Sequence, residues 1–155
     1  MQNAIRFEND RFNHVETKPN YKNDLCHGED LARWLCEELD KRSFPTISIL
    51  QEDWGWLGHV ACDGQSYALM IGWIPAPDNH WQIVTERNVG FWKRLFDSSD
   101  RREVGELTSV IDEIIRSDTS NTGIRWLQLD SSGNESEESD RLQSLEGTVA
   151  TSLES

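Results

Sequence analysis

Hydrophobic positions along the chain recur with two different periods, and these periods divide it into predicted strands and helices. Apolar side chains at every second residue are typical of a strand with one buried face. They predict strands at residues 46–50, 55–62, 66–74, 80–86 and 123–129. Apolar side chains at spacings of three and four predict two helices, at residues 29–41 and 100–117.

The alternation changes phase in the middle of this pattern. Ile47 and Ile49 are apolar at odd positions, whereas Trp54 and Trp56 are apolar at even positions. A slip of one residue sends every side chain of a strand to the opposite face of the sheet. The chain must therefore turn or bulge between residues 50 and 54, where Gly55 tolerates the backbone angles that a turn requires.

Three further segments complete the predicted elements. Residues 4–7 and 11–15 predict two short edge strands joined by a turn at residues 9–10. Asp63-Gly64 predicts a two-residue hairpin. Residues 90–96, Gly-Phe-Trp-Lys-Arg-Leu-Phe, predict a short helical turn that packs its aromatic rings inward.

This order of elements indicates an α+β fold in two layers. We expect an antiparallel twisted sheet of about five to six strands, with the two long helices on one face. Residues 1–129 are long enough to form a single domain with a substantial core. Residues 130–155 are rich in serine and glutamate and contain no aromatic residue, so a disordered acidic tail is expected there.

The charge of the chain restricts its partners. The formal net charge is −13, and residues 130–155 contribute about half of it, with seven acidic residues and one base. Nucleic acids and anionic membranes bind basic surfaces, so direct binding to either is not expected. A basic protein partner is compatible with this charge.

Cysteine usage and hydropathy favour a cytoplasmic protein. The three cysteines form an odd set without a close pair, and no hydrophobic signal segment follows Met1. No run approaches the roughly 20 apolar residues of a membrane helix. The sequence leaves open whether the protein is a monomer or a homodimer.

Motifs for metal, cofactor or nucleophilic chemistry are missing from the sequence. Cys26, His27, His59 and Cys62 could meet only by folding, and they lack the spacing of a metal motif. There is no nucleophile elbow and no glycine-rich phosphate loop. We expect no metal, no cofactor and no catalytic residue.

The high number of tryptophans, seven, is the most informative feature of the composition. Trp34, Trp56 and Trp126 lie in apolar stripes and are expected in the core. Trp54 stands beside Glu52 and Asp53 at the predicted turn. One interpretation is that the indole is buried and the two acids are solvated turn residues. The other is that the three residues form a binding surface, because tryptophan often anchors interfaces.

The first predicted helix carries a second candidate patch. Glu37, Glu38 and Asp40 lie opposite its apolar stripe. A charged outer face is ordinary for a surface helix. The alternative is that these acids extend a binding surface for a basic partner.

Four segments in order resemble a known group of proteins. They are residues 28–35 (Gly-Glu-Asp-Leu-Ala-Arg-Trp-Leu), 52–56 (Glu-Asp-Trp-Gly-Trp), 92–96 (Trp-Lys-Arg-Leu-Phe) and 124–126 (Ile-Arg-Trp). This series resembles a group of small, uncharacterised bacterial cytoplasmic proteins over residues 4–126. The resemblance implies a shared fold and a bacterial or phage source, but no activity. The chain departs from it at Asp97, where glycine is expected.

Three functional hypotheses follow from the sequence. The first is a non-enzymatic acidic binding protein that inhibits a basic partner, such as a toxin, a nuclease or a defence-complex subunit, by occupying its surface or channel. The second is a small enzyme or ligand-binding domain at the Glu52-Asp53-Trp54 corner, with one acid as a base and His59 or His80 as its partner. The third is a regulatory or scaffold subunit that acts through its acidic tail.

Overall fold

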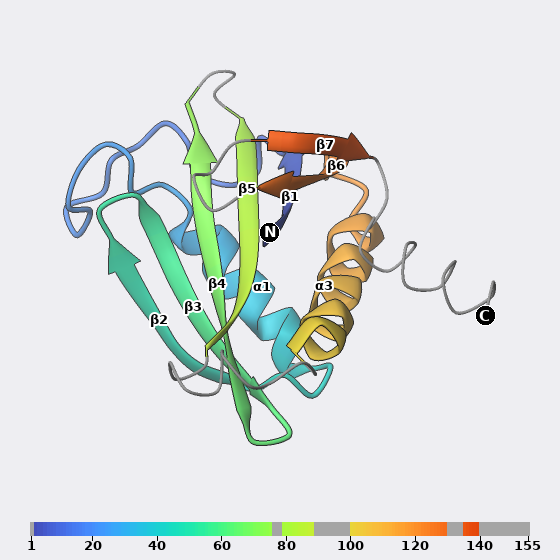
Figure 1. Ribbon diagram of the computed structural model, residues 1–155. Helices are drawn as coiled ribbons and strands as arrows, with labels where there is room; N and C mark the ends of the chain where they lie inside the picture. The colour runs from blue at the N-terminus through green and yellow to red at the C-terminus, as the bar shows by residue number, and fades with distance from the viewer. Residues whose placement is uncertain (1, 76–78, 89–99, 130–134, 140–155) are drawn as a thin grey trace.

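A computed structural model of the protein describes residues 2–75, 79–88, 100–129 and 135–139 (Figure 1). Within these ranges, two helices and seven strands form a single α+β unit. The elements in chain order are β1 Gln2–Glu8, α1 Glu29–Asp40, β2 Thr46–Glu52, β3 Gly55–Cys62, β4 Gln65–Ile74, β5 His80–Asn88, α3 Asp100–Ser117, β6 Thr122–Leu129 and β7 Glu135–Ser139.

All seven strands belong to one antiparallel sheet, in the order β2-β3-β4-β5-β1-β6-β7. Both helices lie on the same face of it (Figure 1). The two-layer arrangement expected from the sequence is therefore confirmed. Neither helix within the described ranges combines the length and apolar character needed to cross a membrane.

The core lies between the helices and the sheet. Its largest fully buried side chains come from both layers: Trp81, Trp126, Phe7, Ile5, Leu31, Leu35, Leu39, Leu69, Ile71, Ile83, Leu107 and Ile111. Burial of one such aliphatic side chain contributes about 1.5–3 kcal/mol to stability. The predicted core positions of Trp56 and Trp126 are confirmed. Trp34 is only half-buried, because it lies at the edge of the core with the Arg11 guanidinium 5.3 Å from the centre of its ring.

The first strand lies inside the sheet, which corrects the predicted edge hairpin. β1 pairs with β5 on one side and with β6 on the other. Residues 11–15 do not form the predicted second strand. The reason is local polar bonding: Asn9 Oδ1 accepts a hydrogen bond from the Arg11 amide at 2.7 Å, and Asn13 Oδ1 accepts one from the Glu16 amide at 2.9 Å. Asparagine side chains that bond the following backbone favour turns over strands.

The predicted change of phase between β2 and β3 is a hairpin turn. Asp53 and Trp54 form a two-residue turn closed by the pair Glu52 and Gly55. Gly55 has φ of 151°, and a side chain there would collide with the Ile71 carbonyl of β4. The hairpin predicted at Asp63-Gly64 is also confirmed, since both of its residues have positive φ.

The C-terminal part differs from the predicted disordered tail. Residues 135–139 form β7, which pairs with β6. The sheet therefore has seven strands, more than the five to six expected. Strand pairing uses backbone groups and needs no apolar side chains, and an uncovered edge favours it. Residues 130–134 and 140–155, and the helical turn predicted at residues 90–96, lie outside the described residues.

An apolar row crosses the face of the sheet opposite the helices. The paired residues along it are Leu50, Leu57, Met70, Val84, Ala4 and Leu127. Val84, Ala4 and Leu127 are buried, whereas Leu57 and Met70 are half-buried and Leu50 is exposed. The apolar surface of this face is therefore most accessible toward β2.

Candidate binding surface at the corner between β2 and β3

Trp54 is exposed at the hairpin turn between β2 and β3. Its exposed fraction is 43%, whereas Trp56, two residues later, is 4% exposed. Asp53 is also exposed, and Glu52 is half-buried. The interpretation of Trp54 as a core residue is therefore wrong, and the carboxylates of Glu52 and Asp53 precede it in the same turn.

The loop of residues 18–26 holds this corner from outside. Gln51 binds the loop twice: its side-chain oxygen accepts from the Lys22 amide at 2.7 Å, and its side-chain nitrogen donates to the Asn20 carbonyl at 2.8 Å. Asn23 donates to the Asp53 carbonyl at 2.9 Å. These hydrogen bonds hold the backbone of the turn in one conformation.

Cys26 ties the same loop to the hairpin. Its thiol lies 3.2 Å from the Glu52 carbonyl, and its own carbonyl accepts the indole N–H of Trp56 at 2.8 Å. None of the three cysteines forms a disulfide within the described residues. Burial raises the pKa of the Cys36 thiol to about 11, so this sulfur stays protonated and unreactive at neutral pH.

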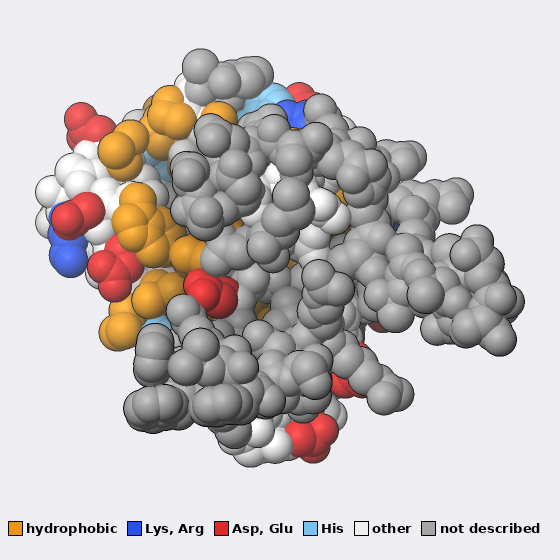
Figure 2. Space-filling model, in the orientation of Figure 1, with side chains coloured by type: hydrophobic (Ala, Val, Ile, Leu, Met, Phe, Trp, Pro, Cys, Tyr) orange, Lys and Arg blue, Asp and Glu red, His pale blue; other side chains and the backbone are white. Residues whose placement is uncertain are grey.

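Exposed aliphatic side chains lie near the corner and along β2. Leu25 and Leu50 are each 49% exposed, and Ile47, near the other end of β2, is 58% exposed. Figure 2 shows hydrophobic side chains gathered over β2 and β3, with acidic side chains beside them. An apolar patch with a polar rim is typical of a surface that binds another protein.

The three acids predicted as a patch on α1 do not act together. Glu38 binds Lys41 at 3.0 Å and Arg42 at 2.9 Å, and these hydrogen bonds lower the pKa of its carboxyl group. Asp40 accepts a hydrogen bond from the Thr46 amide at 2.6 Å, at the start of β2. Glu37 is exposed. Asp40 thus adds negative charge beside β2, whereas the charge of Glu38 is compensated.

The histidines proposed as catalytic partners lie away from the corner. His59 is four residues along β3 from Gly55, about 13 Å at the usual rise of a strand. Its ring contacts Ser48 at 3.1 Å. His80 is buried on β5, with its ring 3.8 Å from Glu8 of β1. The structure therefore does not bring Glu52 or Asp53 together with either ring.

His27 lies buried at the start of α1, between the rings of Tyr21 at 5.7 Å and Trp73 at 4.7 Å. Its Nδ1 atom has no hydrogen-bond partner within the described part of the chain. Burial lowers the pKa of this imidazole, and the neighbouring His14 lowers it further. Within the described residues, no group of three or more His, Cys, Asp or Glu side chains could hold a metal ion.

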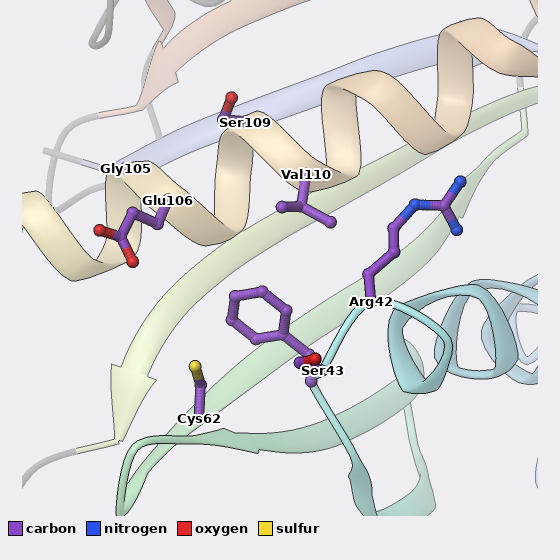
Figure 3. Close-up of a pocket in the computed structure, with 8 residues that line it drawn as sticks. Arg42, Ser43, Cys62, Gly105, Glu106, Ser109 and Val110 are labelled. Carbon is purple, nitrogen blue, oxygen red and sulfur yellow. The ribbon is translucent and has the colours of Figure 1, made fainter.

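A cavity of about 430 Å³ opens at a different place, between the C-terminal end of α1, the end of β3 and α3 (Figure 3). No pattern in the sequence indicated this cavity. Phe44, Cys62 and Val110 give it an apolar lining, with Arg42 and Glu106 at its rim. The Arg42 guanidinium is bound to the Glu38 side chain and carbonyl, so it does not offer an open anion site.

No protein-family model matches the chain, and searches of curated proteins and of solved structures find none that matches it. The function of the protein is therefore inferred from its surface residues.

Proposed function

We propose that the protein is a non-enzymatic, acidic binding protein that inhibits a basic protein partner by occupying its surface or channel. The observation that supports this most directly is the exposed Trp54, fixed beside Glu52 and Asp53 by the loop of residues 18–26. An exposed tryptophan on a turn whose backbone is held supplies contact area, and the carboxylates steer a positively charged partner toward it.

A bacterial toxin, a nuclease or a subunit of a defence complex fits this chemistry. Proteins that act on nucleic acids carry basic channels for their substrates. An acidic protein of net charge −13 is attracted to such a channel and competes with the substrate for it. In this proposal the tryptophan supplies short-range contacts that charge alone cannot provide.

Affinity capture from a bacterial lysate tests the proposal. The full chain should retain a basic protein that is released by added salt, because exposed ion pairs are screened. The Trp54→Ala variant should bind the retained partner about 30-fold more weakly, as expected for an interface anchor. Glu52→Gln combined with Asp53→Asn should slow association at low salt. These constants are measured by surface plasmon resonance.

A charge-matched control separates the corner from overall charge. Glu106 and Glu113 are exposed on α3, so Glu106→Gln combined with Glu113→Gln removes the same charge from another surface. This variant should keep the wild-type affinity for the partner. Equal losses in the two double variants would contradict the assignment of the corner. Failure to retain any protein above an acidic control of equal charge would contradict the function.

A further inference from the structure

The outer edge of β2 is unpaired in the described structure. β2 stands first in the sheet order and pairs only with β3. Its two-residue turn closes with Glu52 opposite Gly55, and antiparallel pairing alternates from there. The backbone groups of Gln51 and Ile49 accordingly face away from β3, whereas the bulge between Thr46 and Ser48 interrupts the alternation at Ile47. The Gln51 carbonyl shows this direction, since the Lys22 ammonium group lies 3.4 Å from it.

Only the ends of this edge are occupied. The loop of residues 18–26 contacts Gln51 and Glu52, and Asp40 binds the Thr46 amide. Among the described residues, no hydrogen bond reaches the outer backbone groups of Ile49. Ile49 therefore offers a backbone donor and a backbone acceptor to a further strand.

The middle of the edge carries little protection against strand pairing. Natural edge strands often carry lysine, proline, a bulge or a covering loop, each of which discourages pairing with another chain. β2 contains neither lysine nor proline, and it exposes Ile47 and Leu50 by 58% and 49%. The bulge near Thr46 and the loop of residues 18–26 protect only its two ends. Ile49, between them, is accessible to a partner strand.

The surrounding charges select the chemistry of that strand. Asp40 lies at the start of β2, and Glu52 and Asp53 lie at its end. These three carboxylates outnumber the one positive charge at this edge, the Lys22 ammonium group beside Gln51, so they attract a basic segment. A second copy of the chain would bring the same carboxylates and a net charge of −13 to the same edge, which disfavours self-pairing.

We propose that the outer edge of β2 binds an extended, basic and aliphatic segment of the partner as an additional strand of the sheet. This inference rests on the proposed function and states how the partner is held. Backbone hydrogen bonds centred on Ile49 give affinity, as in other cases of strand addition. An aliphatic side chain opposite Leu50 extends the apolar row through Leu57 and Met70, and basic side chains on the other face lie toward Asp40.

A model peptide tests this mode of binding with the full chain. The probe is an acetylated seven-residue peptide in which lysine and valine alternate, added to ¹⁵N-labelled protein and followed by NMR. We expect saturable binding with Kd below about 1 mM, and at least about tenfold slower hydrogen exchange at the Ile49 amide. The same peptide with proline as its central residue should bind at least about tenfold more weakly, because proline removes a backbone donor.

Two lysine variants locate the contact. Leu50→Lys places a positive charge on the edge and removes an aliphatic contact, and it should weaken peptide binding at least about tenfold. Val15→Lys adds the same charge at a residue that is 83% exposed and outside the sheet, so it should leave the affinity within about threefold.

Each outcome bears on one of the two proposals. If the proline peptide binds equally well and chemical-shift changes are confined to residues 52–54, strand addition is overturned. The proposal that the protein binds a basic partner would then still stand. Absence of saturable binding up to about 1 mM would overturn strand addition alone, since lysate capture tests the partner separately. Protection of Ile49 that rises with protein concentration without peptide would assign the edge to a second copy.

Discussion

At the scale of single residues, Gly55 controls how closely β3 approaches β4. Its φ of 151° is unfavourable for other residues, and an added Cβ would meet the Ile71 carbonyl. We expect Gly55→Ala to lower the free energy of unfolding by about 2–4 kcal/mol, through backbone strain together with overpacking. Gly64 is the matched control, because it has φ of 77° and open space around it. Gly64→Ala should cost about 1 kcal/mol.

Urea unfolding of the two glycine variants separates strain from collision. Equal losses of stability would show that the contact with Ile71 is unimportant and that the positive φ alone requires glycine at residue 55.

His27 makes stability depend on pH. Burial and His14 lower the pKa of its ring below the ordinary value of 6.5, so the folded protein holds the imidazole neutral. The unfolded chain takes up a proton as the pH falls through about 6.5, whereas the folded chain does so only at lower pH. The free energy of unfolding should therefore decrease from pH 7.5 to pH 5.5. Urea unfolding at both values measures this decrease.

The variant His27→Gln removes the titrating group and keeps a polar side chain. It should show a smaller decrease in stability between pH 7.5 and pH 5.5 than the wild type, even if it is less stable at both. An unchanged pH dependence would assign the effect to other groups.

At the scale of elements, β7 distinguishes two parts of the acidic C-terminal region. A chain that ends at residue 139 keeps the pairing of β7 with β6, whereas one that ends at residue 129 loses it. We expect the shorter chain to unfold at lower urea concentration, by about 1–3 kcal/mol for the lost strand pairing. The chain ending at residue 139 should keep both the stability and the partner affinity of the full chain. Loss of affinity in that chain would favour the mechanism in which the tail binds the partner.

Element types were predictable because their signals are local. The stripe of Leu31, Leu35 and Leu39 in α1 and the alternation in β4 depend only on spacing. The ion pairs of Glu38 with Lys41 and Arg42 follow from spacings of three and four residues, so the sequence could have indicated that this acid is compensated. The place of β1 in the sheet was not predictable, because its partners β5 and β6 are distant in the chain.

Local signals and contacts between distant residues also differ in the candidate site. The change of phase placed Glu52, Asp53 and Trp54 at a turn, and turns lie at the surface, so the exposure of Trp54 could be predicted from the sequence. The hydrogen bonds from Lys22 and Asn23 were not, since they depend on how the loop of residues 18–26 folds back onto the hairpin.

At the scale of the whole molecule, exposed apolar surface and carboxylates occur together near β2. The helical layer and the sheet enclose one main core, whereas exposed aliphatic side chains and Trp54 lie along β2 and its turn. Asp40, Glu52 and Asp53 lie beside them, with the Lys22 ammonium group as a nearby positive charge. If the proposed function holds, this is the side that meets the partner.

The position of β1 also sets the order in which the protein can fold. Ile5 pairs with Ile83 on one side and with Trp126 on the other. During synthesis on the ribosome, β1 therefore remains unpaired until most of the chain has been made. Contacts between such distant residues raise the contact order and slow folding. During this interval Ile5 and Phe7 are exposed to chaperones and to neighbouring chains, so yield in the cell depends on how quickly β6 arrives to close the sheet.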